Sequence, residues 1–590
     1  MYLLLFLLAA GLNIVMGSHE WPAVFAGSLN DPDSYMRLLR IEQGVRAGHL
    51  MVTVARDDSG AGVYVEWSRL LDMLLWLMAA PFALFLGWHK ALYVAGVLLG
   101  PLSVGFLGVV LAWAAEPFAA RRYLWAAAAA AAMLPGFATT AQPGVVGYHI
   151  LLLVLIGLTA GCVARAWRGD RWTGFLAGLA GGFAIWLTPE TMPFILAAYV
   201  ALVLRWWQRP NGVVLLGTAS GFFDVLGLAL FVDPPGGGYA VAEVDRLSYV
   251  YVALGLMLLA GTALLARVQD RLGRGRGPVG LLLLGGLMVG WIAAFPHVAM
   301  GPYGLLPPDQ AKAFFGVMTE LQPVRGAALV VFLLPGFCAV AYALWRGLGP
   351  QRVDFGAIAS AAMLGAPQRH RLLWLYVAAC GLVSLALGVK FVLFVGFSTL
   401  LGAVMLPVAM SEMSAAFAAR PALASAARSA CALLVLVVPL VTAMAVPGAP
   451  AAVPVKGIAA RVYPSCNLRR VAPLLAPYAG QVVLAQVEDT PELLYRSQVE
   501  TVGSLYQHGV PAYLRNRTAW RAVPGADVPP ELLAAGIGYV LFCPAPGRYI
   551  LVQDLPKMTL WDTLEAGQVP GWLSLAGSNA DGWRLYKIRP

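Results

Sequence analysis

The feature that most constrains this chain is a series of apolar runs, each close to the roughly 20 residues that a helix needs to cross a bilayer. Examples are 279–295, 391–410 and 430–446. Of the 590 residues, 60% are hydrophobic and only 12% are charged, about half the charged share of a soluble domain. We therefore expect a polytopic helical membrane protein.

The polar segments between the runs are of two kinds. Arginine-rich segments lie near 121–122, 165–171, 205–209, 267–276, 346–371 and 420–428. Segments with carboxylates and turns but almost no arginine lie at 142–149, 188–190, 233–246, 296–322 and Lys390. The positive-inside rule places the first kind in the cytoplasm and the second outside. This bias accounts for the net charge of +10, so we expect membrane lipids and not nucleic acid as partners.

Thirteen spans fit this alternation. They lie near 2–16, 91–115, 123–138, 149–164, 173–187, 191–204, 213–231, 249–266, 279–295, 327–345, 372–389, 391–410 and 429–446. The run 70–88 is long enough to span, but counting it would place Arg121 and Arg122 outside. We expect it to lie on the outer interface as an amphipathic or re-entrant helix. An odd number of spans puts the two ends of the chain on opposite sides.

Composition divides the chain into two parts. Residues 1–446 form the membrane domain, with a first outer loop at 18–90 that contains interfacial helices. Residues 447–590 are polar and predict a small outer α/β domain. Strands are expected at 482–487, 539–543, 572–576 and 583–588, and helices at 468–478 and 530–535. If the domain lies in the periplasm of a bacterial inner membrane, a disulfide between Cys466 and Cys543 is plausible.

Asp31 and Asp33 stand in the first outer loop, just before a helical pattern that contains Tyr35, Leu38 and Leu39. Helix capping is the ordinary explanation, with Asp33 as the N-cap. Capping does not require Asp31, and a pair of acids at a membrane surface also suits a divalent cation or a general base. Both interpretations stay open.

Three further carboxylates are candidates. Glu320 lies in the outer loop at 317–323, and Glu190 lies at an outer helix junction beside proline. An exposed surface position and helix capping are their ordinary explanations. Asp224 lies well inside a span, where an acid is costly, so it predicts a functional or pairing role.

Among the outer polar residues, Asp245 and Arg246 precede the eighth span, Lys390 lies between the eleventh and twelfth, and His149 begins the fourth. Anchoring at the membrane surface is one explanation for the two cations, and holding a phosphate is another. The sequence has no Walker loop, nucleotide-binding glycine motif, HExxH or GxSxG, so ATP-driven transport and hydrolase chemistry have no support.

With these features the chain resembles the membrane-embedded glycosyltransferases of the C-type superfamily, and within it the catalytic subunit of oligosaccharyltransferase. Residues 30–37 look like the first aspartate motif of that family, with Asp31 in the metal-binding position. Residues 317–323 resemble its glutamate motif, with Glu320 as the second metal and acceptor acid.

The resemblance implies inverting transfer of a sugar from a polyprenyl-phosphate or diphosphate donor to a glycan, lipid or protein acceptor on the outer face. It implies catalytic roles for Asp31, Asp33 and Glu320, and Mg or Mn held by Asp31, Glu320 and His149. Arg246, Lys390 and Arg37 are expected at the donor phosphate.

The chain also resembles bacterial relatives of unassigned function. The shared segments are Asp31-Pro-Asp-x-Tyr-Met-Arg37, Trp67-Ser-Arg69-x-x-Asp72, the Pro-Glu at Glu190, and Asp245-Arg246-x-Ser248.

Two positions depart from the family pattern. Gly147 replaces an acid and Val145 an arginine, so a metal site would lose one ligand unless His149 or water substitutes. The Trp-Trp-Asp motif that reads a protein acceptor is absent from the C-terminal domain, so protein N-glycosylation is not expected. The alternatives are a non-catalytic assembly subunit, which Gly147 favours, and a polyprenyl-lipid transporter, which Asp224 favours.

Overall fold

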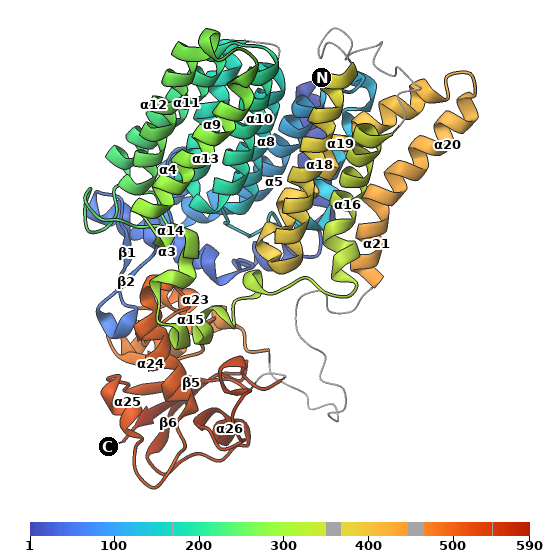
Figure 1. Ribbon diagram of the computed structural model, residues 1–590. Helices are drawn as coiled ribbons and strands as arrows, with labels where there is room; N and C mark the ends of the chain where they lie inside the picture. The colour runs from blue at the N-terminus through green and yellow to red at the C-terminus, as the bar shows by residue number, and fades with distance from the viewer. Residues whose placement is uncertain (168–169, 350–366, 446–464, 545–546, 590) are drawn as a thin grey trace.

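The computed structural model describes residues 1–167, 170–349, 367–445, 465–544 and 547–589. Figure 1 shows a bundle of long helices with a C-terminal α/β domain at one end, and the N-terminus at the opposite end of the bundle. The first outer loop lies between the bundle and this domain. The domain boundary expected at 446/447 lies outside the described residues.

Within the described chain, eight helical segments are long and apolar enough to cross a membrane. The bundle helices are α1 (Tyr2–Met16), α5 (Trp88–Ala115), α6 (Trp125–Met133), α7 (Pro135–Ala138), α8 (His149–Ala166), α9 (Arg171–Leu187), α10 (Met192–Gln208), α11 (Gly212–Val232), α12 (Tyr249–Leu272), α13 (Arg276–Ala294), α16 (Ala328–Leu348), α18 (Pro367–Lys390), α19 (Val395–Ala416), α20 (Pro421–Ala432) and α21 (Val438–Ala445).

Helices lie at all thirteen predicted positions, but not all of them count among the eight segments. Several, such as α1 and α6, are shorter than 18 residues. One segment of 46 residues, Tyr249–Ala294, holds both α12 and α13, because Gly273 with φ 51° interrupts it. The fold is therefore that of a polytopic helical membrane protein, with eight candidate membrane-spanning segments in the described chain.

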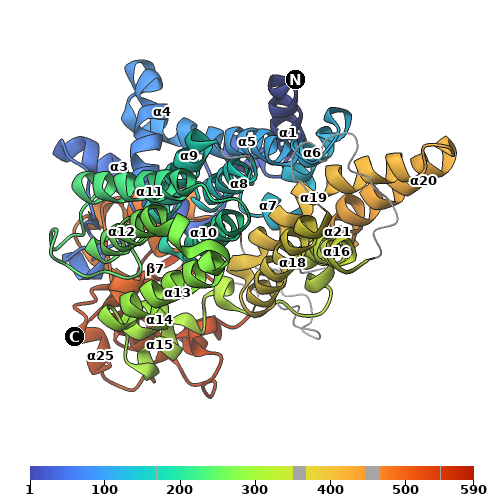
Figure 2. The ribbon, with the colours of Figure 1, turned by 45° about the horizontal axis from the view of Figure 1, so that its top comes forward.

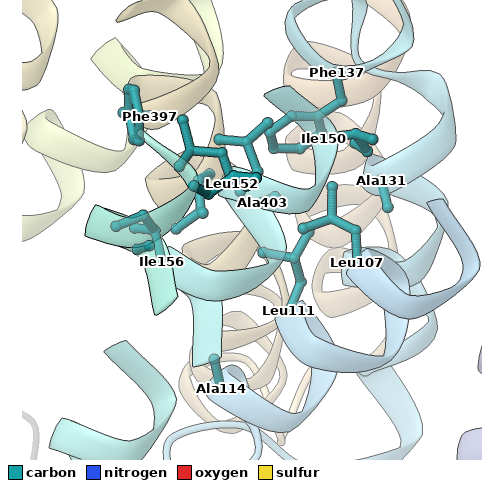
Figure 3. Packing of buried hydrophobic residues seen from close by; sticks show 14 of the residues in the cluster. Leu107, Leu111, Ala114, Ala131, Phe137, Ile150, Leu152, Ile156, Phe397 and Ala403 are labelled. Carbon is teal, nitrogen blue, oxygen red and sulfur yellow. The ribbon is translucent and has the colours of Figure 1, made fainter. Parts of the chain in front are cut away.

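Small residues let the bundle helices approach closely. The alanine run 126–132 in α6 is fully buried, where α6 meets α1, α5 and α19. Figure 3 shows Leu107, Ala131 and Ile150 packed together in this core. Between α9 and α11, a side chain at Gly178 would collide with the carbonyl of Thr218, so one face of α11 is fixed against α9.

The first outer loop contains α2 (Trp21–Phe25), α3 (Pro32–Ala47), the strand pair β1 (Thr53–Val54) and β2 (Val63–Tyr64), and α4 (Leu70–Leu86). The start of α4 is held where Asp72 meets Arg37 of α3. Just after its end, His89 contacts Glu42 of α3 and stacks on Tyr495 of the C-terminal domain. The chain therefore enters and leaves α4 close to the C-terminal domain, and an interfacial or re-entrant position for this helix stays a prediction.

The C-terminal domain is built on a five-stranded sheet of order β4-β3-β5-β7-β6. Its strands are β3 (Val482–Leu484), β4 (Glu500–Thr501), β5 (Tyr539–Phe542), β6 (Leu573–Ser578) and β7 (Arg584–Ile588), and its longer helices are α23 (Thr490–Arg496), α24 (Val510–Arg521), α25 (Pro530–Ala534) and α26 (Leu560–Glu565). β3 pairs in parallel with β4 and β5, and the other pairs are antiparallel. The four predicted strands are confirmed, β4 was not predicted, and a disulfide joins Cys466 to Cys543.

The C-terminal domain is tied to the first outer loop by buried polar contacts. Arg56 donates to the carbonyls of Leu494 (2.7 Å) and Ser497 (2.6 Å). Asp57 is completely buried and accepts from the hydroxyls of Thr501 and Ser504. These contacts fix the position of the domain segment that follows Thr501, which reaches the candidate site.

Candidate active site

The first helix turn of α3 positions two acids. Asp31, and not Asp33, is the N-cap: its two oxygens accept from the backbone N–H and the hydroxyl of Ser34, both at 2.7 Å. Pro32 occupies the first helical position, which it favours because it lacks an N–H. Asp33 is therefore free of the capping role expected for it, and its Oδ1 accepts from the Tyr506 hydroxyl at 3.0 Å.

Three glutamates from distant segments converge on these aspartates. Glu320 lies in a short turn at Thr319–Leu321, Glu190 in a turn at Pro189–Thr191, and Glu66 just after β2. The group is close enough to interact electrostatically: Asp31 raises the pKa of Glu320, Glu320 and Glu66 raise that of Glu190, and Asp33 raises that of Glu66. We call Asp31, Asp33, Glu66, Glu190 and Glu320 the acid site.

Burial is the main reason why these carboxyl groups hold protons unusually well. It raises the pKa of Asp33 and Glu66 to about 7 and that of Glu190 to about 8, with smaller contributions from neighbouring charges. Asp33 and Glu320 nevertheless keep accessible surface, and the Glu320 side chain is 56% exposed. They are enclosed by protein yet reachable, so they face an internal space. Carboxyl groups with these properties suit proton transfer near neutral pH.

Arg37 lies next to the acid site and holds α3 against the start of α4. It is 2% exposed, lies 3.1 Å from Asp72 and stacks 4.2 Å from the ring centre of Trp67. Arg40 binds the other oxygen of Asp72 at 2.7 Å. Because Arg37 is buried against Asp72 and Trp67, it holds α3 in place and offers almost no exposed surface to a donor phosphate.

Arg246 and Arg69 converge on Asp233, which is completely buried. Arg246 is 1% exposed and also donates to the hydroxyl of Tyr64 at 3.2 Å. The indole N–H of Trp186 donates to the same carboxylate at 2.9 Å. This buried cluster leaves Arg246 no surface for the phosphate expected there, and it gives Arg69 and Arg246 a structural role.

Two residues of the C-terminal domain reach the site, and sequence reasoning missed both. Tyr506 binds Asp33, and His508 lies 2.9 Å from Asp245, whose charge raises the pKa of Glu66. Tyr506 is separated from Asp33 by 473 positions. No local pattern marks either residue, since each is recognisable only after the domain has docked.

A cavity of about 140 Å³ opens beside Glu320 and His149, lined also by Thr139 and Phe397. Next to it, the loop after Glu320 pairs with the end of α18, where the N–H of Val324 donates to the carbonyl of Val389 at 2.9 Å. Each of the two paired segments carries one cation next to this bond: Arg325 follows Val324, and Lys390 follows Val389. Both are exposed, and neither has an ion-pair partner in the part of the chain that is described.

A second cavity, of about 260 Å³, lies at membrane depth among α8, α10, α18 and α19. Its lining is almost entirely apolar, with Thr159 and Ser384 among the few polar side chains. Phe397 lines both cavities. The apolar cavity therefore adjoins a space that contains the acidic side chain of Glu320.

The donor set does not fit the expected Mg or Mn site. His149 Nε2 lies 3.9 Å from Glu320, but both oxygens of Asp31 are engaged by Ser34. Among the described residues, no group of three His, Cys, Asp or Glu side chains is arranged to hold a metal ion. Gly147 stands beside His149 and supplies no ligand.

No protein-family model and no curated protein sequence matches the chain. Among solved structures, the archaeal oligosaccharyltransferase AglB of Archaeoglobus fulgidus, in complex with an inhibitory peptide and a dolichol-phosphate, superposes with a TM-score of 0.65 at 12% identity, over 92% of this chain and 69% of AglB. The apo form gives a TM-score of 0.66 at 13% identity with the same coverage. The chain shares the fold of this oligosaccharyltransferase.

This finding confirms the resemblance stated from the sequence motifs at the level of fold. ArnT from Cupriavidus metallidurans aligns over 97% of this chain at 14% identity, but its TM-score of 0.34 does not establish a common fold. The match to AglB extends over 92% of the chain, so it includes most of the C-terminal domain as well as the membrane helices.

Proposed function

We propose that this protein is an inverting glycosyltransferase of a bacterial inner membrane. It takes a sugar from a polyprenyl-phosphate or diphosphate donor and passes it to a glycan, lipid or protein acceptor on the side of the C-terminal domain, the periplasm. The observation that carries the proposal is the pair of cavities that share Phe397. A lipid tail fits the apolar cavity, and its sugar phosphate then lies beside Glu320.

The charges around the cavity beside Glu320 suit the donor. Lys390 is exposed and lies two residues before Val392, which lines this cavity, and Arg325 is exposed and lies five residues after Glu320. Cations at these positions neutralise the charge that a phosphate gains as it leaves. AglB, which has the same fold, was solved with a dolichol-phosphate. We assign the phosphate to Lys390, as the sequence suggests, and to Arg325 in place of Arg37 and Arg246.

Glu320 is our candidate for the general base. It is accessible in the cavity, and burial together with the charge of Asp31 raises its pKa. Glu320 takes the proton of the attacking acceptor, the acceptor oxygen or nitrogen bonds to the anomeric carbon, and the sugar–phosphate bond breaks with its electron pair on the polyprenyl phosphate. Asp31 makes Glu320 a stronger base, and Asp33, held by Tyr506, binds the acceptor.

This mechanism contains no metal step. AglB was also solved in a complex with Zn and sulfate, but the described residues of this chain offer two neighbouring ligands, Glu320 and His149, and no third. The base and the two cations supply proton transfer and charge stabilisation without one.

The test is transfer by the purified full-length protein in phospholipid vesicles. Radiolabelled polyprenyl-phosphate mannose, polyprenyl-phosphate glucose and polyprenyl-diphosphate N-acetylglucosamine are each supplied with a membrane extract as the source of acceptors. We expect label to leave one donor at least 100-fold faster with the natural protein than with Glu320→Gln, whereas Glu531→Gln, at an exposed site on the C-terminal domain, keeps the natural rate. Equal rates for the natural protein and Glu320→Gln would contradict the proposal.

A non-catalytic assembly subunit is the second candidate, and Gly147 favours it. A Cβ atom at that position would meet only Val145 and His149, at 3.6 and 3.8 Å, so the backbone there has room for a side chain and yet carries none. A subunit of this kind binds the lipid donor without cleaving it. In the vesicle experiment it would therefore release label from no donor, whereas the enzyme releases label from one.

A further inference from the structure

Asp224 is a carboxylate on the lipid-facing surface of the bundle. It lies in α11, about 18 Å from Gly212 and about 12 Å from Val232 along the helix axis. Both distances place it inside the hydrocarbon layer, which is about 30 Å thick. Asp224 is exposed, and within the described chain it makes no ion pair or hydrogen bond.

The surroundings of Asp224 confirm that this face meets lipid. Leu228 and Phe231 on the same face of α11 are 51% and 73% exposed, and Leu256 of the neighbouring α12 is 54% exposed. The rest of α11 is packed against α9 and α12, which lie on either side of it in Figure 2. Asp224 therefore does not line a path through the bundle, and the feature that favoured a lipid transporter loses its support.

A carboxylate in hydrocarbon is unfavourable, and acids inside spans usually face the bundle or pair with another group. Asp224 does neither within the described residues, so its partner lies outside this part of the chain. We infer that the face of α11 around Asp224 is a docking surface for a transmembrane helix of another protein that carries a lysine or arginine at the same depth. Gly227 faces open space, so a partner helix can approach closely there.

Charge complementarity favours a different protein over a second copy of this chain. In the described spans, lysine and arginine lie toward the helix ends, as Lys390 and Arg346 do, and Arg428 of α20 is engaged with Ser414. A second copy would bring Asp224 against its own counterpart, which adds a like charge.

The experiment uses the full-length protein in phosphatidylcholine vesicles and two synthetic transmembrane helices. Both helices are leucine-rich and carry a dansyl label, and one has a single lysine at its centre where the other has leucine. Binding is measured by energy transfer from the tryptophans of the protein. We expect the lysine helix to bind the natural protein at least tenfold more tightly than the leucine helix.

Two variants complete the test. Asp224→Leu removes no described contact and should bind both helices equally, whereas Leu228→Ala, on the same face, should keep the preference within threefold. Equal binding of both helices to the natural protein would overturn the inference, as would an equal loss in the two variants. Dimers of the natural protein that dissociate in Asp224→Leu would overturn it too, because they would assign this face to a second copy.

Discussion

The hydroxyl of Tyr506, from the C-terminal domain, donates to Oδ1 of Asp33, from the first outer loop, at 3.0 Å. The Tyr506 ring packs edge-on against Trp67 at 5.3 Å, and Trp67 in turn stacks under Arg37. The C-terminal domain is thus part of the acid site, and the membrane helices alone do not complete it.

Tyr506→Phe should lower transfer about tenfold at pH 7 and move the acid limb of the pH profile to higher pH. The lost hydrogen bond stabilises the ionised carboxylate, so without it the pKa of Asp33 rises above about 7. The measurement is the rate of transfer between pH 6 and 9. Tyr513→Phe is the matched control, because that hydroxyl bonds to the carbonyl of Ala313 away from the site.

A double-mutant cycle separates this role from a general effect on folding. In an Asp33→Asn background, Tyr506→Phe should change the rate less than twofold, since the tyrosine acts through the aspartate. Additive losses in the double variant would contradict the assignment.

The two substitutions Asp31→Ser and Asp31→Ala should separate capping from chemistry. Serine is a good N-cap and alanine a poor one, so only Asp31→Ala should lose about 1 kcal/mol of unfolding free energy. Both variants should lose transfer at least 100-fold, because both remove the charge that raises the pKa of Glu320. Thermal unfolding and transfer rates give the two readouts. A serine variant that kept a tenth of the natural rate would refute the role of Asp31.

Metal removal should have little effect on the natural protein. With two neighbouring ligands and no third, we expect transfer in excess EDTA to stay within twofold of the untreated rate. Gly147→Asp adds a carboxylate beside His149 and should raise Mn²⁺ affinity at least tenfold by calorimetry. Gly571→Asp, at an open site on the C-terminal domain, is the control. Loss of transfer in EDTA and recovery with Mg²⁺ would contradict this prediction.

The contact between Asp57 and the C-terminal domain should make stability depend on pH. Burial raises the pKa of Asp57 from 3.8 to about 6, so folding takes up a proton between these values. The associated stability is complete below about pH 4 and is lost as the pH rises through 6, by at most about 3 kcal/mol. Tm should therefore fall between pH 4.5 and 7. In Asp57→Asn this contribution to the decrease of Tm with pH should be absent. Identical slopes in the two proteins would show that Asp57 does not titrate in this way.

Local patterns in the sequence were sufficient for much of the fold. The apolar runs, the four strands of the C-terminal sheet and the amphipathic pattern of α3 all follow from short-range periodicity. The N-cap of α3 could also have been assigned, because Pro32 favours the first helical position and so makes Asp31 the cap.

The site could be predicted only in part, since most of it depends on pairings between distant segments. The sequence placed four of the acids in loops on one side of the membrane, and the structure brings them close enough to interact: Asp31, Asp33, Glu190 and Glu320. The burial of Arg246 follows from its partner Asp233, and the contact of Tyr506 with Asp33 follows from domain docking. Neither partner is marked by spacing or composition.

The most direct measurement of the central claim is a structure of the full-length protein with bound polyprenyl phosphate. We expect the phosphate to lie within about 4 Å of Lys390 Nζ or the Arg325 guanidinium, on the side that faces Glu320. We expect the lipid tail to pass Phe397 and enter the apolar cavity. A phosphate bound at the opposite end of the bundle, beside Arg346, would contradict this claim.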